Sequence, residues 1–402
     1  MDLRTRIEAE AQAARRAVPL LTDEAVAAAL AHAATLVRDR QAGILAANSE
    51  DVDAADGLDE GTLDRLRLDE RRVASLAGQV ASLAELEPIR READAWTLPN
   101  GLRVSERRIP IGVVGANFEA RPGVALDVAG QLLKSLNAGV LRTGAAALRT
   151  ATVLVDDVLR PALESAGLPP DAIGLVRSPD REGARILVSL PRLVPLVILR
   201  GSGETTAALA RLAAESGVRT LAHAEGGGVL YVHSDAAKDK VLGIVAASLD
   251  RLGVCNRLNL CLVDRGANGL VPDLLELFAS RGIEVSEELG REWANDPNPS
   301  QVTVCYLDSL EEAVRIANEE TSGLAAGIVT EDPVAAQAFL DGYRGTAAFW
   351  HATTRFTDGF ALTGAPETGI NVDWTPGPRG PVTYRDLWLR QYRVVGDGTQ
   401  AR

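Results

Sequence analysis

The sequence predicts an α/β protein in which helices cover both faces of mostly parallel sheets. Short apolar stretches alternate with helical stretches twice along the chain, first over residues 109–222 and again over residues 228–350. Glycine-rich turns follow several predicted strands, and Gly201-Ser202-Gly203 is the clearest example. Strands and helices that alternate through short turns are typical of doubly wound sheets, which bind ligands at the carboxyl ends of their strands.

The first part of the chain is predicted to be helical. Residues 1–95 are rich in Ala, Leu, Glu and Arg with helical periodicity, and Thr22 is a typical capping residue. Asn100-Gly101, between alternating residues, predicts a hairpin near residues 96–109. The first alternating unit then has predicted strands at 109–116, 138–142, 173–176, 193–199 and 218–222, and predicted helices at 124–135 and 145–166 and one that ends near 216.

The second alternating unit begins near Gly226. Its predicted strands lie at 258–263, 301–307, 327–329 and 345–350, and its predicted helices at 236–252, 272–281, 310–319 and 333–341. A loop-rich segment follows at 373–380, and a final strand starts at Trp388. We therefore divide the chain into residues 1–225, 226–362 and 363–402.

The composition narrows the class of protein. The 402 residues carry a net charge of −13, which argues against nucleic acid or an anionic membrane as a partner. Three cysteines are too few for a disulfide framework, and no apolar run reaches the roughly 18 residues of a membrane span. The first residues lack the apolar centre of a signal peptide, and the four histidines show no ligand spacing. We expect a cytoplasmic enzyme or binding protein without a metal site.

The most informative stretch is Gly253-Val254-Cys255-Asn256, which leads into an apolar strand. A thiol held by such a turn can be partly exposed and can attack a carbonyl carbon. The backbone N–H of Cys255 and a nearby amide such as Asn256 could then stabilise an oxyanion. The alternative is that Cys255 is a small buried hydrophobe, as most free cysteines are.

The turn Gly201-Ser202-Gly203 has two interpretations of similar weight. Its small residues let the backbone approach a phosphate, and the Ser202 hydroxyl can donate a hydrogen bond to one. The same residues also suit a tight connection from a strand to a helix.

Several motifs together resemble the γ-glutamyl phosphate reductase family of the aldehyde dehydrogenase superfamily. They are Pro110-Ile-Gly-Val-Val-Gly115, Phe118-Glu119-Ala-Arg121-Pro122, Leu133-Lys-Ser-Leu-Asn137-Ala, Gly253-Val-Cys255-Asn256, Thr354-Arg355-Phe-Thr357-Asp-Gly359 and Tyr392-Arg-Val-Val-Gly-Asp-Gly398. The resemblance implies an aldehyde dehydrogenase-like fold with two doubly wound Rossmann-type domains. Residues 1–225 would bind the cofactor, residues 226–362 would carry Cys255, and residues 363–402 would return to the cofactor side. The hairpin would serve assembly into a homodimer or homotetramer.

The resemblance also implies a mechanism. In this family a cysteine thiolate attacks an acyl phosphate, phosphate leaves, and NADPH delivers hydride to the thioester, which collapses to an aldehyde. Cys255 takes the role of the nucleophile, and its main-chain N–H helps to hold the oxyanion. His223 stands at the position of a family histidine that could move a proton, with Glu225 as a nearby alternative base. Without such a role, His223 would be a surface histidine in a glycine-rich loop.

Asn117 departs from the reductase pattern, which usually has an apolar residue at this position. The wider superfamily places an Asn-Phe pair there, and its asparagine donates to the oxyanion. Asn117-Phe118 restores that pair, so we hypothesise that Asn117 assists the oxyanion. An asparagine that satisfies its own turn is an equally weighted alternative.

For the cofactor, the resemblance implies NADP(H). Arg142 stands where the superfamily uses a lysine at the adenosine ribose, and Ala145 replaces the acidic residue that would select NAD. Gly201, Ser202 and Gly203 would hold the pyrophosphate, although Thr143-Gly144 offers another arrangement. Asp296 replaces the glutamate expected at the nicotinamide ribose.

For the substrate, the matching motifs place Glu119, Arg121, Arg355 and Thr357 around its anionic ends, because arginine pairs well with carboxylate and phosphate. Structural ion pairing is the alternative role for these side chains. The chain departs from the family pattern at segments such as His223-Ala-Glu225-Gly-Gly-Gly228 and Pro366-Glu367. These departures cluster around the active site, so they affect the identity of the substrate more than the thioester chemistry. γ-Glutamyl phosphate is the expected substrate. Another acyl phosphate, a carrier- or CoA-bound thioester, and a catalytically silent scaffold protein remain alternatives.

Overall fold

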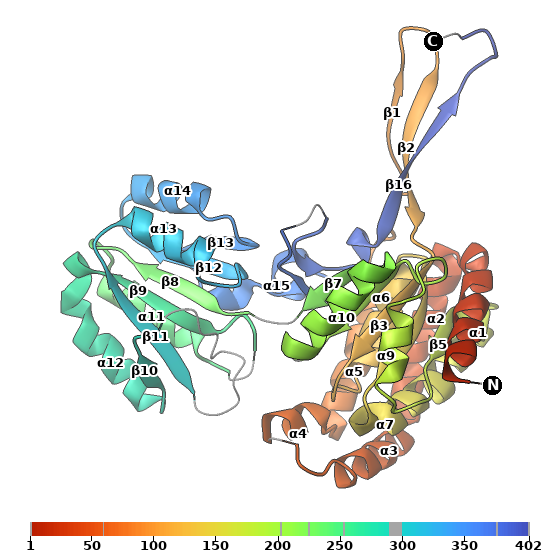
Figure 1. Cartoon of the computed structure of the whole chain (residues 1–402), viewed down its shortest axis with the longest axis horizontal. Coiled ribbons are helices and arrows are strands. Elements are labelled where there is room, and N and C mark those ends of the chain that lie inside the picture. Colours follow the sequence, from red (N-terminus) through yellow and green to blue (C-terminus); the bar gives the residue numbers. More distant parts are fainter. Residues whose placement is uncertain are drawn as a thin grey trace.

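The protein has two α/β lobes and a long β arm that projects from one of them (Figure 1). The structure, a computed structural model, describes residues 2–58, 60–201, 203–223, 226–251, 254–288, 300–374 and 377–400. Within these ranges no single helix is long and apolar enough to cross a membrane. One pair, Leu3–Leu20 and Asp23–Asp39, meets that test only when its two parts, bent by 119°, are taken together.

The first lobe is built on a parallel five-stranded sheet in the order β5-β4-β3-β6-β7. Its strands are β3 (Val113–Phe118), β4 (Ala138–Thr143), β5 (Ile173–Leu175), β6 (Leu196–Arg200) and β7 (Arg219–His223). The helices of this lobe are α1 (Leu3–Ala17), α2 (Asp23–Asp39), α3 (Gln41–Asp53), α4 (Glu60–Leu66), α5 (Glu70–Glu85), α6 (Val124–Lys134), α7 (Leu148–Val153), α8 (Arg160–Ser165), α9 (Glu182–Leu187) and α10 (Gly203–Ser216).

Successive side chains of these strands pack on opposite faces of the sheet. In β6, Val197 and Leu199 join a buried cluster with α1, α9 and α10, whereas Ile198 joins the cluster with α2, α5 and α6. Burial on both faces explains why the strand sequences are continuously apolar instead of alternating. The predicted doubly wound arrangement of this unit is confirmed.

The second lobe contains a parallel six-stranded sheet in the order β10-β11-β9-β8-β12-β13. Its strands are β8 (Gly228–Val232), β9 (Leu258–Asp264), β10 (Glu284–Ser286), β11 (Gln301–Leu307), β12 (Ala325–Val329) and β13 (Ala347–Trp350). The helices α11 (Lys238–Ser248) and α12 (Val271–Ser280) cover one face. The helices α13 (Leu310–Glu319) and α14 (Pro333–Gly342) cover the other.

The arm consists of β1 (Glu92–Thr97), β2 (Arg103–Pro110) and β16 (Trp388–Val395) in an antiparallel sheet. Leu98 accepts a hydrogen bond from the N–H of Gly101, whose φ of +87° suits glycine, so the predicted hairpin is confirmed. The end of the chain returns to pair with β2, from Trp388 beside Pro110 to Val395 beside Arg103. Before it come α15 (Gly359–Thr363) and the short pair β14 (Gly369–Asn371) and β15 (Gly380–Val382).

The predicted helix over residues 145–166 is not a uniform α-helix. Residues Leu154–Leu159 form a π-helical segment between α7 and α8. Pro161 lies just beyond it and has no N–H for the regular hydrogen-bond pattern. Segments of this kind insert into α-helices without ending them, and periodicity alone does not reveal them.

The connection of strands in the first sheet determines where a ligand site can form. The chain enters at β3, continues outward through β4 and β5, and then returns to β6 on the other side of β3. The loops after β3 and β6 therefore leave the sheet in different directions, and such a switch point opens a crevice at the carboxyl ends of the strands. β7 ends at His223 and β8 begins at Gly228, so the amino end of the second sheet lies close to this crevice.

Asn137 ties the arm to the first sheet, and its removal should destabilise the protein. Its fully buried amide donates to the Leu387 carbonyl at 2.8 Å and accepts from the Gly112 N–H at 3.0 Å. Asn137→Ala leaves both backbone groups unpaired, so we expect the free energy of unfolding to fall by about 3 kcal/mol. Denaturant titration measures this change. The exposed control Asn268→Ala should change it by less than about 0.5 kcal/mol, and an equal effect of both variants would contradict the prediction.

Candidate active site

Cys255 lies in the turn immediately before β9, where its side chain is half-buried. The residues around it are apolar: Cys255 packs against the cluster of Leu324, Ala325 and Ile370. Neither Cys261, which is fully buried in β9, nor Cys305, which lies in β11, occupies such a turn. The structure therefore presents one thiol at the amino end of the second sheet.

Three consecutive glycines allow the chain to pass directly beside this turn. A Cβ atom at Gly226 would lie 2.7 Å from the Cβ of Cys255, and one at Gly227 would lie 2.8 Å from Nδ2 of Asn259. A Cβ at Gly228 would lie 2.9 Å from the Arg257 carbonyl oxygen, which accepts the Gly228 N–H at 2.7 Å. A side chain at Gly226 or Gly228 would meet a backbone oxygen, and one at Gly227 would displace the Asn259 side chain, so this glycine run is required by the close approach of two chain segments.

Asn256 holds the loop of residues 354–357 against the cysteine turn. Its Nδ2 donates to the carbonyl oxygens of Arg355 at 3.1 Å and Thr357 at 3.0 Å, and its Oδ1 accepts from Nη1 of Arg355. The Thr354 hydroxyl donates back to the Asn256 carbonyl at 2.9 Å. The Asn256 amide thus positions the loop of residues 354–357. To act as an oxyanion donor, as the sequence predicts, it would have to break its hydrogen bonds to the carbonyls of Arg355 and Thr357.

Of the two candidate substrate residues of this loop, the Arg355 side chain is engaged within the chain and the Thr357 side chain is buried. Arg355 pairs through Nε with Asp250 at 2.7 Å and also binds Asn256. Thr357 is fully buried, and its hydroxyl has no hydrogen-bond partner. The structure brings Asn256, Arg355 and Thr357 together, and it uses the first two to support the turn.

The thiol is surrounded by charges of both signs. The pKa of Cys255 is raised to about 11, mainly by burial and to a smaller extent by the Glu367 carboxylate. The guanidinium groups of Arg200 and Arg121 oppose this increase in pKa because they stabilise the thiolate. Glu367 itself accepts the Gly359 N–H at 2.6 Å, and burial raises its own pKa. In this state of the protein the sulfur is therefore protonated at neutral pH.

The ends of β3, β4 and β6 bring the predicted oxyanion and cofactor residues to one edge. Asn117 is paired in register with Arg142 and Leu199. Nη1 of Arg142 donates to Oδ1 of Asn117 at 3.1 Å, and Nη2 donates to the carbonyls of Pro179 and Asp180. Because arginine carries only donors, this contact fixes the orientation of the Asn117 amide and directs Nδ2 away from Arg142.

The residues predicted to bind the cofactor are only partly described. Gly203 is the first residue of α10, and Gly201 precedes that helix. A Cβ at Gly201 would lie 3.0–3.1 Å from the carboxyl group of Glu119, so this acidic side chain covers the turn. Ser202, Glu225 and Asp296 lie outside the described residues, and His223 is described only as the last backbone position of β7.

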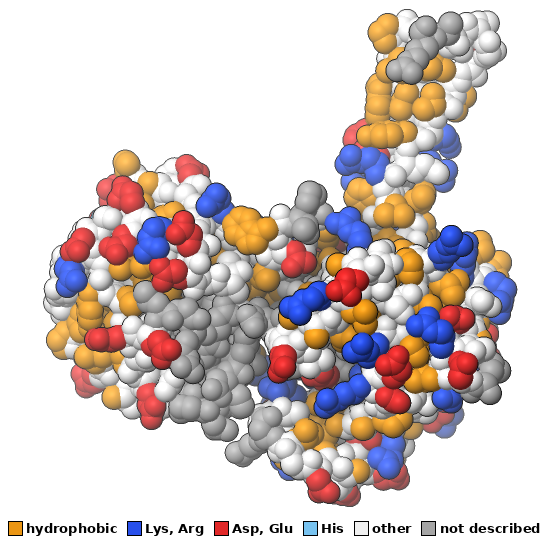
Figure 2. Space-filling view, in the orientation of Figure 1, with side chains coloured by type: hydrophobic (Ala, Val, Ile, Leu, Met, Phe, Trp, Pro, Cys, Tyr) orange, Lys and Arg blue, Asp and Glu red, His pale blue; other side chains and the backbone are white. Residues whose placement is uncertain are grey.

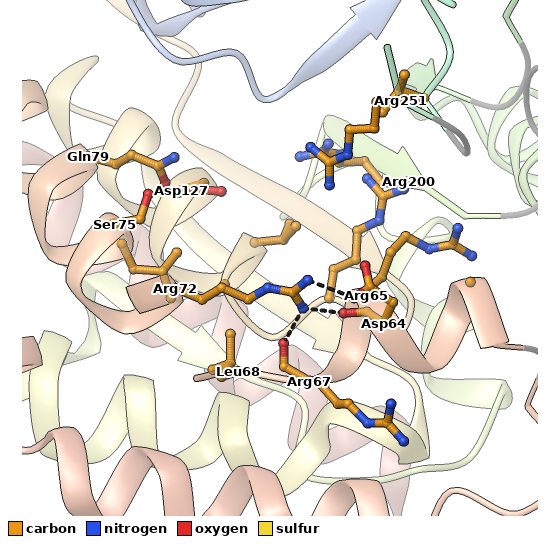
Figure 3. A pocket seen from close by; sticks show the side chains of 16 residues that line it. Asp64, Arg65, Arg67, Leu68, Arg72, Ser75, Gln79, Asp127, Arg200 and Arg251 are labelled. Carbon is orange, nitrogen blue, oxygen red and sulfur yellow. Dashed lines mark hydrogen bonds and ion pairs between the residues drawn. The ribbon is translucent and has the colours of Figure 1, made fainter. Parts of the chain in front are cut away.

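A pocket of about 630 Å³ opens beside the cysteine turn and contains residues that the sequence did not single out (Figure 3). Arg121, which the sequence did predict, lines it together with Val254 of the turn. The additional charged lining residues come from segments far apart in the chain: Asp64, Arg65, Arg67, Arg72, Asp127, Arg200 and Arg251. None of them belongs to a recognisable motif, and only the folded chain brings them together.

The charges around Cys255 predict how its reactivity responds to substitution. With a pKa near 11, the rate of alkylation by iodoacetamide should rise about tenfold per pH unit from pH 7 to 9. Glu367→Gln removes a charge that raises this pKa, so alkylation at pH 8 should be roughly three- to tenfold faster. Arg200→Ala removes a charge that lowers it, so alkylation should slow by a similar factor.

Mass spectrometry of the Cys255 peptide measures these rates separately from Cys261 and Cys305. The exposed control Glu276→Gln should leave the rate unchanged. A rate that levels off below pH 9, or that moves in the same direction in both variants, would contradict the assignment of charges.

Comparison with known proteins agrees with this fold. No protein-family model matches the chain. Gamma-glutamyl phosphate reductase from Clavibacter michiganensis is 38% identical over 395 residues, which cover 93% of this chain and 88% of the relative. The enzyme of the same name from Zymomonas mobilis is 33% identical, with 92% and 90% covered.

Solved structures show the same relationship. Gamma-glutamyl phosphate reductase from Thermotoga maritima superposes with a TM-score of 0.92 at 25% identity, covering 98% of this chain and 100% of that one. An acetylating aldehyde dehydrogenase from Geobacillus thermoglucosidasius shares the fold with a TM-score of 0.72 at 16% identity, covering 100% and 99%. The expected aldehyde dehydrogenase-like fold is confirmed, and the chain belongs to the gamma-glutamyl phosphate reductase family.

Proposed function

We propose that this protein reduces γ-glutamyl phosphate to glutamate-5-semialdehyde with NADPH, as a step of proline biosynthesis, through a thioester on Cys255. The observation that carries the proposal is a single half-buried thiol at the amino end of the second sheet, with Arg121 and Arg200 acting on it. The family membership supplies the reaction, because relatives named for it match nearly the whole chain.

The residues of the chain suit the formation of that thioester. Sγ of Cys255 forms a bond to the acyl carbon while the bond from that carbon to the phosphate oxygen breaks. Arg121 and Arg200 stabilise the thiolate and the departing phosphate. The backbone N–H of Cys255 and Nδ2 of Asn117 are the proposed donors to the oxyanion. His223 is the proposed proton acceptor, since it ends the strand that leads to the glycine run.

The carboxyl end of β4 fits a nicotinamide cofactor. Nε of Arg142 and the hydroxyl of Thr143 are buried there without hydrogen-bond partners, so both can donate to a ribose or a 2′-phosphate. We propose that these residues hold the adenosine half of NADP(H) and that Gly201, Ser202 and Gly203 hold its pyrophosphate. Glu119 lies over Gly201, and we propose that it turns away when the cofactor binds. Bound NADPH supplies the hydride that reduces the acyl group.

We further propose the predicted division into residues 1–225 for the cofactor, 226–362 for Cys255 and 363–402 as the returning segment. The arm would join copies into a dimer or tetramer. It exposes large hydrophobic side chains, which cover much of its visible face (Figure 2): Trp96, Leu389, Tyr392, Val394 and Val395. Contiguous apolar surface of this kind marks an interaction site.

All three cysteines are free, which supports a reducing compartment such as the cytoplasm.

Activity in the oxidative direction tests the proposed reaction. Purified protein with NADP⁺, phosphate and glutamate-5-semialdehyde should produce NADPH, followed by absorbance. Cys255→Ala should abolish this signal, because no other thiol can form the thioester. Cys305→Ala changes a half-buried cysteine in β11 and should retain activity. Wild-type protein without NADPH production, or an active Cys255→Ala variant, would refute the proposal.

Two substitutions of Asn117 separate an oxyanion role from a structural one. Asn117→Ala should lower kcat by roughly 100-fold if its amide donates to the oxyanion. Asn117→Asp retains an acceptor for Arg142 but cannot donate from that position when ionised. If Asn117 only supports Arg142, Asn117→Asp should restore activity. If it binds the oxyanion, both variants should remain slow. Unchanged turnover of Asn117→Ala would remove the oxyanion role.

A further inference from the structure

The pocket beside Cys255 contains more positive charge than the fold itself requires. Its walls are α4, α5, the connection from β3 to α6, the first turn of α6, the end of β6, and residues 251 and 254. Arg72 has a structural role, since it pairs with Asp64 at 2.7 Å and donates to the Arg67 carbonyl at 2.7 Å (Figure 3). It thereby holds the connection between α4 and α5 in place. The Arg67 side chain is exposed, and this residue contributes its carbonyl oxygen to the hydrogen bond with Arg72.

Four other arginines of the pocket have no such role. Among the described residues, no ion pair joins Arg65, Arg121, Arg200 or Arg251 to a carboxylate. Arg65 donates to the Thr62 hydroxyl at 2.8 Å, which occupies only one of its nitrogens. A guanidinium presents five donors in a fixed plane. Most of the donors in this group therefore remain available.

These guanidinium groups are close enough to repel one another. The pKa of Arg121 is lowered to about 10, mainly by burial and to a smaller extent by the charges of Arg200, Arg65 and Arg251. Mutual repulsion among guanidinium groups that form no ion pair costs stability, and a bound anion would relieve it. The cluster thus has the properties of a preformed anion site.

The wall of the pocket opposite Arg200 and Arg251 carries a carboxyl group and neutral polar groups. Ser75 and Gln79 lie one turn apart on α5, and Asp127 lies near them on α6, across the pocket from Arg200 and Arg251 (Figure 3). Burial raises the pKa of Asp127 to about 6, with a smaller contribution from Glu367, whereas Arg200 lowers it. This carboxyl group is still ionised at neutral pH. A carboxylate with a hydroxyl and an amide nearby suits an ammonium group.

We propose that this pocket recognises the amino-acid end of the substrate. Arg65 and Arg251 bind its α-carboxylate, and Asp127 binds its α-ammonium group. Arg121 and Arg200 face the acyl phosphate, because theirs are the guanidinium charges that act on the Cys255 thiol. The inference rests on the proposed function, and it assigns specificity to α4, α5 and α6 rather than to the motifs around the thiol. A γ-acyl phosphate of an α-amino acid carries all the groups that this arrangement would bind.

Substrates that lack one charged group at a time test the assignment. The aldehydes are glutamate-5-semialdehyde, 5-oxopentanoate, which lacks the ammonium group, and pentanal, which lacks both groups. Arg251→Ala and Arg65→Ala should raise KM for the first two by roughly 10- to 100-fold with kcat nearly unchanged. They should leave kcat/KM for pentanal unchanged. Asp127→Asn should lower kcat/KM for glutamate-5-semialdehyde about tenfold or more and not for 5-oxopentanoate.

Arg71→Ala is the matched control, since it removes an exposed arginine of α5 that does not line the pocket and should change none of these constants. Equal losses on all three aldehydes would mean general damage and would overturn the inference. If the wild-type protein turns over glutamate-5-semialdehyde and the pocket variants have the same kinetic constants, the inference is overturned too, while the proposed function stands.

Calorimetric binding of L-glutamate and glutarate gives a readout that does not depend on turnover. Wild-type protein should bind L-glutamate more tightly than glutarate, and Asp127→Asn should remove this difference. Arg251→Ala should weaken both ligands. If the wild-type protein turns over no aldehyde, the proposed function fails, and this titration still decides whether the pocket recognises an amino acid. Equal affinity of the wild-type protein for both ligands would refute the ammonium site.

Discussion

The active site depends on the close packing of two backbone segments, the glycine run of residues 226–228 and the cysteine turn. The glycines allow β8 and β9 to begin side by side, so that the Gly228 N–H reaches the Arg257 carbonyl. Asn256 then fixes the loop of residues 354–357 on the other side of the turn. The sulfur is therefore positioned by main-chain contacts around it, and its own side chain stays available for chemistry. A nucleophile needs this combination of a rigid frame and a free side chain.

The topology of the first sheet supplies the charges. Because β3 and β6 are neighbours but lead to helices on different sides, their ends carry Asn117 and Arg200 to one crevice. Arg142 reaches Asn117 from β4, which links the proposed cofactor position to the proposed oxyanion donor through one hydrogen bond. The N-terminal helices, which add nothing to the sheet, close the pocket with Arg65 and Ser75. Each layer of the lobe thus contributes a different wall.

The sequence predicted what short segments determine and missed what distant segments create. Continuous apolar runs identified the buried strands, and the motif around Cys255 identified the thiol, because both signals lie within a few neighbouring residues. The Asn256 amide was predicted at the oxyanion, but the structure engages it with the carbonyls of residues 355 and 357. Three of the pocket arginines, Arg65, Arg200 and Arg251, gave no signal, since several helices and strands separate them along the chain and they looked like ordinary surface charges.

The charges also bear on when the thiol can lose its proton. Arg121 and Arg200 are the cations that stabilise a thiolate on Cys255, and in the proposed reaction the same two groups face the acyl phosphate. A bound phosphate dianion neutralises them and so withdraws their support from the thiolate. Since burial and Glu367 already hold the pKa near 11, a stable thiolate in the substrate complex is unfavourable. Deprotonation therefore belongs to the step in which sulfur attacks the acyl carbon, and that step requires a proton acceptor near the sulfur, which is the role proposed for His223 at the end of β7.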